Sequence, residues 1–273
     1  MCDMCVIESV KEKMLSRRDL LKVGGAALAA GAVATGASAS AAMAAGHGKV
    51  EDLTHTYDDK FPTYFGQPGV EITQPFTYAE HKFNLFQLNL NEHTGTHMDA
   101  PLHFSADGQA VDEIPVENLV VPLCVVHIHE KAAEDADAEV TPDDLKAWIS
   151  KNGPIPDNAC VAMHSGWSKH VNSDKFRNAD GEGVMHFPGF HIEAAQMLME
   201  ETKAVGMAVD TLSLDYGKSK DFKTHYAWLP TNRWGIENIA NLDKLPEAGA
   251  TLVVGAPKHR GGSGGPCRIF AMV

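Results

Sequence analysis

A dense run of metal-ligand side chains lies between His93 and Phe104, in the segment HTGTHMDAPLHF. Three histidines and one aspartate occur there within eleven residues, and these residue types bind metal ions. The segment therefore predicts a metal site, and any fold of this chain must bring these side chains together. The alternative is a polar strand face that continues into a solvated loop, which is the more common explanation of any single histidine.

The spacing of these side chains fits an extended chain better than a helix. Residues 86–91 alternate between apolar and polar side chains, which predicts a half-buried strand. If the alternation continues, four ligand-type side chains fall on the odd-numbered face and project the same way. These four are His93, His97, Asp99 and His103. Gly95 permits a kink and Pro101 excludes a continuing helix, so we do not expect a helical zinc pair.

Two imidazoles and one carboxylate suit zinc, manganese or ferrous iron. His93, His97 and Asp99 as ligands leave coordination positions open for water and substrate. His103, with a ring that titrates near neutral pH, is then free to carry a proton. A metal ion lowers the pKa of its water toward about 7 and polarises a carbonyl. Our hypothesis is hydrolysis by a metal-bound hydroxide, with His103 as the proton shuttle.

The run His93, Gly95, Thr96, His97, Asp99, Pro101 and His103 resembles the signature of the cyclase family of metal-dependent hydrolases, which includes bacterial kynurenine formamidase and isatin hydrolase. The resemblance extends from about residue 50 to residue 273. It implies a swivelling β/β/α architecture and a homodimer or homotetramer. It also implies cleavage of a C–N amide bond, in an aryl formamide such as N-formylkynurenine or in a cyclic amide such as isatin.

A second group of ligand-type residues contains His225 and Glu237, twelve positions apart with Pro230 between them. On sequence alone each is more simply a structural polar residue, because no single helix face can pair them. The family carries a histidine and, twelve residues later, a glutamate in the Ile-Glu-Asn context matched by residues 236–238. In two-metal members these complete a binuclear site with the shared aspartate, here Asp99. The resemblance therefore implies one or two divalent ions, with zinc or manganese favoured.

The first 45 residues form a predicted export signal. Residues 16–22 resemble the twin-arginine motif, and an uncharged Ala/Gly-rich run follows as far as Ala45. Ala42 and Ala44 supply a cleavage site of the A-x-A type. We expect a periplasmic or secreted protein without stable membrane anchoring, and a mature hydrolase domain over residues 46–273. A retained transmembrane anchor is the alternative.

Charge and periodicity limit the remaining possibilities. Without residues 1–45 the chain has 18 Lys and Arg against 32 Asp and Glu, a net charge of −14, which disfavours binding to nucleic acid or anionic membranes. Strand-like and helical patterns interleave without a regular βαβ rhythm, which predicts a single α/β domain with a mixed sheet. Cys124, Cys160 and Cys267 lie in apolar runs and are expected to be buried thiols, since their odd number argues against a disulfide framework.

Local patterns give the expected elements. Strands are expected at residues 120–129, 159–164, 204–209, 250–255 and 267–273, and helices at 142–153 and 191–202. Loops are expected at 50–78 and 131–139, and a tight turn at 261–265. The aromatic, proline-rich segment 50–78 is expected to wall an apolar pocket that receives an aryl substrate. Plain core packing of these aromatic residues is the alternative.

Two other functions fit parts of the pattern. A non-haem iron oxygenase also uses two histidines and a carboxylate, for which His97, Asp99 and His225 are candidates. Such an enzyme needs oxygen, so anaerobic turnover would exclude it. A non-catalytic periplasmic metal-binding protein would take up metal reversibly without turnover, and it would leave His103 without a role.

Overall fold

The computed structural model describes residues 48–273. The export signal predicted in residues 1–45 lies outside the described residues. The chain divides into two compact units, of which one includes Ile72–Gln87 and the other comprises His47–Glu71 and Leu88–Val273. Within the described part of the chain, no helix is long and apolar enough to cross a membrane.

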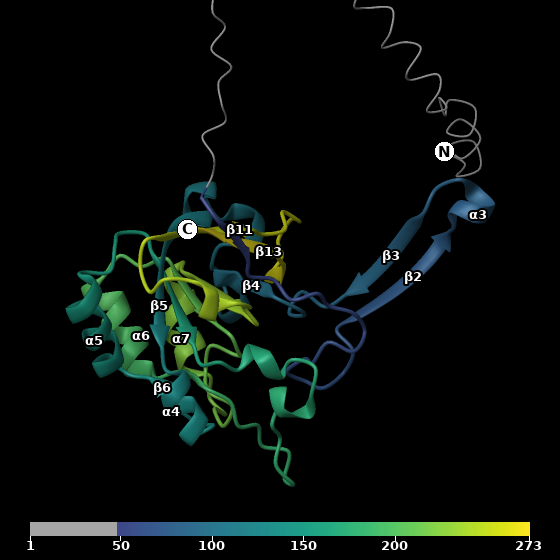
Figure 1. Cartoon of the computed structure of the whole chain (residues 1–273). Coiled ribbons are helices and arrows are strands. Elements are labelled where there is room, and N and C mark those ends of the chain that lie inside the picture. The colour runs from purple at the N-terminus through teal and green to yellow at the C-terminus, as the bar shows by residue number, and fades with distance from the viewer. Residues whose placement is uncertain (1–47) are drawn as a thin grey trace, which may run out of the picture. The chain divides into compact units, whose positions relative to one another are not determined.

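A nine-stranded mixed sheet is the framework of the larger unit (Figure 1). Four central strands run parallel, and the pairs on either side of them run antiparallel. This confirms the predicted α/β fold with a mixed sheet. In sheet order the strands are β1 (Val50–Asp52), β13 (Arg268–Met272), β11 (Ala250–Gly255), β5 (Val120–His127), β7 (Cys160–His164), β9 (Gly206–Val209), β10 (Trp234–Glu237), β4 (His97–Asp99) and β12 (Gly264–Pro266).

Each face of this sheet packs an apolar core. Neighbouring residues of β5 point to opposite faces, so that Leu123 belongs to the first core and Cys124 to the second. The helices α5 (Pro142–Asn152), α6 (Ile192–Glu201) and α7 (Lys223–Trp228) contribute side chains to the second core. Because the central strands are covered on both faces, their sequences are continuous apolar runs.

The two predicted long helices begin and end where their sequences indicate. Thr141 caps α5 through a capping box, in which its Oγ1 accepts from the Asp144 amide and the Asp144 carboxylate accepts from the Thr141 amide. Gly153 ends α5 with a φ of 90°. The ring of His191 accepts from the amide of Glu193 at the start of α6. Local capping chemistry therefore fixes both starts.

The predicted strands of the large sheet are confirmed at β5, β7, β9, β11 and β13. The three cysteines predicted as buried thiols are buried and free. Shorter elements complete the larger unit: α4 (His129–Glu134), the paired β6 (Glu139–Val140) and β8 (Gly189–Phe190), and the 3-10 turns η1 (Pro101–Phe104), η2 (Val111–Glu113), η3 (Val116–Leu119), η4 (Ser168–His170), η5 (Asp174–Phe176), η6 (Leu229–Thr231) and η7 (Leu242–Lys244).

One expected strand has the predicted location but the wrong environment. β3 (Leu85–Leu90) pairs with β2 (Val70–Phe76) in a separate two-stranded sheet, and α3 (Tyr78–His81) lies between them in sequence. All six residues of β3 are exposed. The prediction of a half-buried strand is therefore wrong, because the alternating leucines do not face either core.

Two predicted loops and one predicted turn contain regular structure. The loop expected at 50–78 ends in strand β2, and the loop expected at 131–139 begins inside helix α4. The glycine-rich turn expected at 261–265 runs into β12, which pairs with β4. Gly264 makes this pairing possible, since an added Cβ would lie 2.1 Å from the carbonyl oxygen of Met98. Of these elements, β12 depends on a partner that is distant in sequence.

Candidate functional site

Two antiparallel strands position the centre of the site. β4 pairs with β10 so that His97 lies opposite Glu237 and Asp99 opposite Gly235. Met98 is buried in the first core, so the side chains of His97 and Asp99 leave the other face of the sheet. An added Cβ on Gly235 would lie 2.8 Å from Leu214 Cδ1, so glycine leaves room for that side chain beside the site. His97 and Asp99 share a face, as the alternation predicted.

The fully buried carboxylate of Asp99 lies at the centre of the histidines. Its Oδ1 lies 2.8 Å from His93 Nδ1 and 3.4 Å from His97 Nε2. Its Oδ2 lies 3.6 Å from His225 Nε2. One carboxylate therefore contacts imidazoles from both sequence motifs, which is the position that the shared aspartate of a two-ion site would take.

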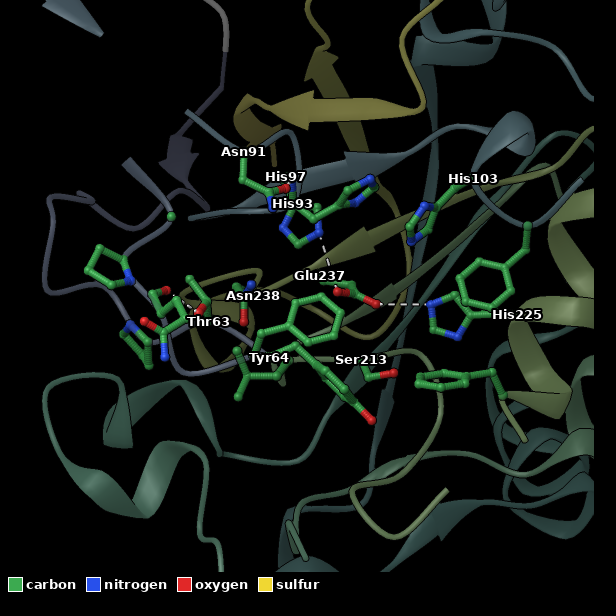
Figure 2. A pocket seen from close by; sticks show the side chains of 18 residues that line it. Thr63, Tyr64, Asn91, His93, His97, His103, Ser213, His225, Glu237 and Asn238 are labelled. Atoms are coloured by element: carbon green, nitrogen blue, oxygen red, sulfur yellow. Dashed lines mark hydrogen bonds and ion pairs between the residues drawn. The ribbon is translucent and has the colours of Figure 1, made fainter. Parts of the chain in front are cut away.

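His225 and Glu237 join this group although twelve residues separate them. His225 Nε2 lies 3.1 Å from Glu237 Oε1, and His97 Nε2 lies 3.3 Å from Glu237 Oε2 (Figure 2). All three side chains are buried. The tertiary fold brings the pair together because α7 delivers the histidine and β10 the glutamate. We call the six residues His93, His97, Asp99, His103, His225 and Glu237 the pocket cluster.

His103 reaches the pocket cluster from a different backbone conformation than we predicted. The chain does not stay extended after Asp99, and Pro101 begins the 3-10 turn η1 that carries His103. The prediction of four side chains on one extended face is therefore wrong at His103. Its ring nevertheless stacks on that of His93, with a centroid distance of 3.8 Å and an interplanar angle of 22°. Burial lowers the pKa of His103 to about 4, so the ring is neutral at pH 7.

Opposite charges stabilise each other inside the pocket cluster. Burial lowers the pKa of His97, but the adjacent carboxylates of Asp99 and Glu237 outweigh this effect and raise it to about 10. Burial raises the pKa of the Asp99 carboxyl, but the surrounding imidazoles outweigh it and hold that pKa well below its ordinary value. Asp99 is therefore ionised at neutral pH, and a metal ion would displace the proton of His97.

Two buried atoms of the cluster have no hydrogen-bond partner among residues 48–273: His97 Nε2 and Asp99 Oδ2. Buried polar atoms are normally satisfied, so these unpaired atoms can bind a cation. The ligand atoms of the pocket cluster include two compact groups. One group is His97 with Asp99 and Glu237, and the other is His93 with Asp99 and His103. Both groups combine imidazole and carboxylate donors, so the residues present fit a divalent metal ion.

Asp215 orients His225, a role that the sequence did not reveal. Its Oδ2 lies 2.6 Å from His225 Nδ1 and accepts from the His225 amide, which leaves Nε2 directed at Asp99 and Glu237. A carboxylate behind a ligating imidazole fixes its tautomer and orientation. The available signal was the acid-containing segment 210–215, which follows β9.

The outer side of His93 contacts another polar group that the sequence did not indicate. Its Nε2 lies 3.0 Å from Ser263 Oγ, and this hydroxyl donates to Glu92 Oε2 at 2.5 Å. Gly95, with a φ of 65°, places its carbonyl oxygen 3.0 Å from His97 Nδ1. His93 is thus held at Nε2 and His97 at Nδ1, which leaves the other nitrogen of each ring to face the pocket cluster. Of these contacts, the sequence predicted only the kink at Gly95.

A pocket of about 400 Å³ opens onto the cluster. The predicted aromatic loop supplies one wall with Tyr64 and Phe65, and Phe104 and Phe222 supply another. The ring centroids of Tyr64 and Phe222 are 5.7 Å apart, and those of Phe104 and Phe222 are 5.6 Å apart. The prediction that the loop walls an apolar pocket is confirmed. Figure 2 shows the labelled polar side chains converging on this space.

Comparison with known proteins agrees with this site. The family model Cyclase, described as "Putative cyclase", matches residues 51–216. Isatin hydrolase of Roseibium aggregatum is 34% identical over 194 residues, which cover 67% of this chain and 73% of that protein. Kynurenine formamidase of Salinibacter ruber is 29% identical over 189 residues, which cover 69% of this chain and 80% of that protein.

Solved structures give the same result. Isatin hydrolase A from Labrenzia aggregata bound to benzyl benzoate has a TM-score of 0.78 and 35% identity, with 82% of this chain and 93% of that chain covered. An isatin hydrolase bound to the product analogue thioisatinate has a TM-score of 0.78 and 30% identity, with 95% of this chain and 99% of that chain covered. Fold and site together define a metal-dependent amide hydrolase. The chain belongs to the cyclase family.

Proposed function

We propose that this enzyme hydrolyses an aryl amide, with a cyclic amide of the isatin type as the first substrate to test and an aryl formamide such as N-formylkynurenine as the second. The observation that carries the proposal is the aromatic pocket that opens directly onto the pocket cluster. Its apolar walls suit an aryl ring, and its polar end suits the amide carbonyl. The similarity to isatin hydrolases over most of the chain supports the order of the two candidates.

The donor chemistry of the pocket cluster, with Asp99 common to both compact groups, supports a metal requirement. We propose that His93, His97 and Asp99 hold one divalent ion, and that Asp99, His225 and Glu237 hold a second ion where one is bound. Zinc and manganese both suit this mixture of imidazole and carboxylate. The bound ion supplies a Lewis acid for the carbonyl oxygen and a water of lowered pKa.

His103 handles the proton in this proposal. Because its ring is neutral at pH 7, a ring nitrogen accepts the proton of the attacking water. The protonated ring is then more acidic than an ordinary imidazolium, and it delivers the proton to the departing amine nitrogen. This delivery matters because an arylamine leaves poorly as an anion. The walls formed by Tyr64, Phe104 and Phe222 orient the aryl ring and exclude bulk water.

The test uses the full chain with isatin, a formanilide and a lactone, before and after chelation and metal re-addition. His103→Ala should lower kcat by about 10²- to 10⁴-fold while keeping its metal, because in this proposal His103 carries the proton and His93, His97 and Asp99 hold the ion. His97→Ala should lose both turnover and metal. Equal turnover of wild type and His103→Ala would contradict the shuttle, and metal-independent hydrolysis would contradict the metal role.

The same assay separates the other candidate functions. The iron oxygenase with His97, Asp99 and His225 as ligands would stop without oxygen, whereas hydrolysis continues anaerobically. Glu237 between His97 and His225 favours hydrolysis, since it adds a carboxylate where such an oxygenase needs open positions. A metal carrier would bind zinc without turning over any of the three substrates.

We also propose twin-arginine export to the periplasm or medium, supported by the motif at residues 16–22. Replacing Arg17 and Arg18 with lysine should keep the protein in the cytoplasm, as judged by fractionation. Equal periplasmic amounts of variant and wild type would contradict export by this route. Terminal sequencing of the exported protein tests cleavage near Ala45.

A homodimer or homotetramer is a further proposal, together with a single swivelling β/β/α domain over residues 46–273. Exposed apolar side chains support assembly, because β3 presents Phe86, Leu88 and Leu90 at alternate positions of one face. Light scattering should show an oligomer that Phe86→Asp with Leu88→Asp dissociates. A monomeric wild type would contradict the assembly, and two separate unfolding transitions would contradict the single domain.

A further inference from the structure

Three histidines from three elements meet outside the pocket. His127 ends β5, His164 ends β7, and His129 is the first residue of α4. β5 and β7 are parallel neighbours whose register places His127 beside His164. Only Ile128 separates His127 from α4, so the short helix brings the third imidazole to the same place. We call these three residues the histidine triad.

The rings of the triad are close enough to share a ligand. His127 Nδ1 lies 2.8 Å from His164 Nδ1. The ring centroids of His127 and His164 are 4.9 Å apart, and those of His129 and His164 are 5.1 Å apart. Each ring offers a nitrogen within 4.8 Å of the other two. Three imidazoles at such distances form the donor set of a His₃ metal site.

Among residues 48–273, none of the three imidazoles forms an ion pair with a carboxylate. The neighbouring acid Glu247 is bound by Lys151 at 2.6 Å and by Asn152 at 2.8 Å. No carboxylate in this part of the chain therefore holds the imidazole nitrogens of the triad, which leaves them available to a cation.

The histidine triad is separate from the pocket cluster. His127 continues the alternation of Leu123 and Val125, which pack in the first core, whereas His97 and Glu237 leave the opposite face of the sheet. None of the three triad residues lines the pocket. Metal binding at the triad can therefore be tested without disturbing the catalytic groups.

We propose that the histidine triad binds one zinc ion, with the fourth coordination position open to solvent through the exposed His129. An all-imidazole donor set suits zinc, copper or nickel and disfavours manganese and magnesium, which prefer oxygen ligands. Zinc–nitrogen bonds of about 2.0–2.1 Å in a tetrahedron place ligand nitrogens roughly 3.3 Å apart. The Nδ1 atoms of His127 and His164 would move apart by about half an ångström. The ring that donates the hydrogen bond between them would carry its proton at Nε2 instead.

The main experiment titrates the metal-free full chain with zinc chloride and measures bound zinc by calorimetry and elemental analysis. His129→Ala should bind one zinc equivalent fewer than wild type, because it removes one of three ligands from an exposed position. His170→Ala is the matched control, since this partly buried histidine belongs to neither cluster. It should bind as much zinc as wild type.

A second measurement keeps the proposal testable if one variant folds poorly. Crystals soaked in zinc should give an anomalous peak between the three rings in wild type, and His164→Gln should lose this peak but keep any peak at Asp99. Equal zinc stoichiometry in wild type and His129→Ala, or no peak at the triad in soaked wild-type crystals, would overturn the proposal. Neither result depends on the amide hydrolase activity, so the two proposals fail separately.

Discussion

The pocket cluster and the histidine triad are two groups of imidazoles on opposite faces of one sheet, and they differ in their carboxylates. The pocket cluster mixes four histidines with Asp99 and Glu237, and His97 and His225 are buried. The triad contains no acid, two of its rings are half-buried and His129 is exposed. The carboxylates allow full burial of imidazole in the pocket, because buried charge is tolerated only when it is paired.

This difference also determines the charge of each group before metal binds. Paired carboxylates raise the pKa of His97 to about 10 despite burial. Burial and the neighbouring His164 instead lower the pKa of His127 and outweigh the opposing charge of Glu247. The pocket cluster is an organised charge array in which His93, His97 and His225 are each held by a second hydrogen bond. The triad is a set of imidazoles without carboxylate partners in the described part of the chain. We infer that carboxylates distinguish the reactive site from a binding site in this fold.

Removing the central carboxylate should have the largest effect. Asp99→Asn keeps the shape but removes the charge that three imidazoles share, so metal content should fall and kcat should drop by more than about 100-fold. Elemental analysis and a hydrolysis assay measure both. Asp107→Asn, in the exposed loop after η1, is the control and should behave as wild type. A fully metallated, active Asp99→Asn enzyme would show that the carboxylate is not what distinguishes the two groups.

Removing the charge behind His225 should have a smaller effect. Asp215→Asn still offers an oxygen to the ring but no negative charge, so metal affinity or kcat should fall by about 10- to 100-fold. The decisive readout is the metal dissociation constant, which a merely structural residue would not change. Asp210→Asn is the matched control, because this buried acid accepts from Ser165 and Trp167 and contacts no member of the cluster. If both variants lose stability but not metal affinity, the orienting role is wrong.

The sequence revealed the parts of the site that depend on local order. Strand alternation places His97 and Asp99 on one face, and the capping box of Thr141 fixes the start of α5. Pairing between distant segments was not predictable in the same way. Asp215 meets His225 only because the chain turns back after β9. Family resemblance alone linked His225 to Glu237.

Errors in the prediction have the same origin. The alternating leucines of β3 match a half-buried strand, but the strand pairs with β2 alone and stays exposed. Gly264 reads locally as part of a turn, yet its missing side chain is what lets β12 approach β4. A sequence pattern indicates which residues can be extended or helical. Burial and strand pairing depend on the partner that the tertiary structure places beside them.

Shortening one aromatic wall should change substrate binding more than chemistry. Phe222→Ala removes a ring that contacts Tyr64 and Phe104, so KM for an aryl amide should rise by about 2- to 12-fold while kcat changes less. Steady-state kinetics on isatin measure both constants. Val116→Ala, at an exposed site outside the pocket, should change neither. An unchanged KM for Phe222→Ala would mean that the aryl ring lies elsewhere.

The smallest effect on turnover is expected at the histidine triad. His129→Ala should leave kcat and KM within about twofold of wild type, because the residue neither lines the pocket nor contacts the pocket cluster. The same variant should show a smaller rise in melting temperature with excess zinc than the wild type, since it loses the part of the rise that comes from the triad, and a ligand that binds only the native state stabilises it by mass action. Differential scanning calorimetry with and without zinc measures this rise. A large loss of turnover in His129→Ala would join the triad to catalysis and would end the distinction between the two groups.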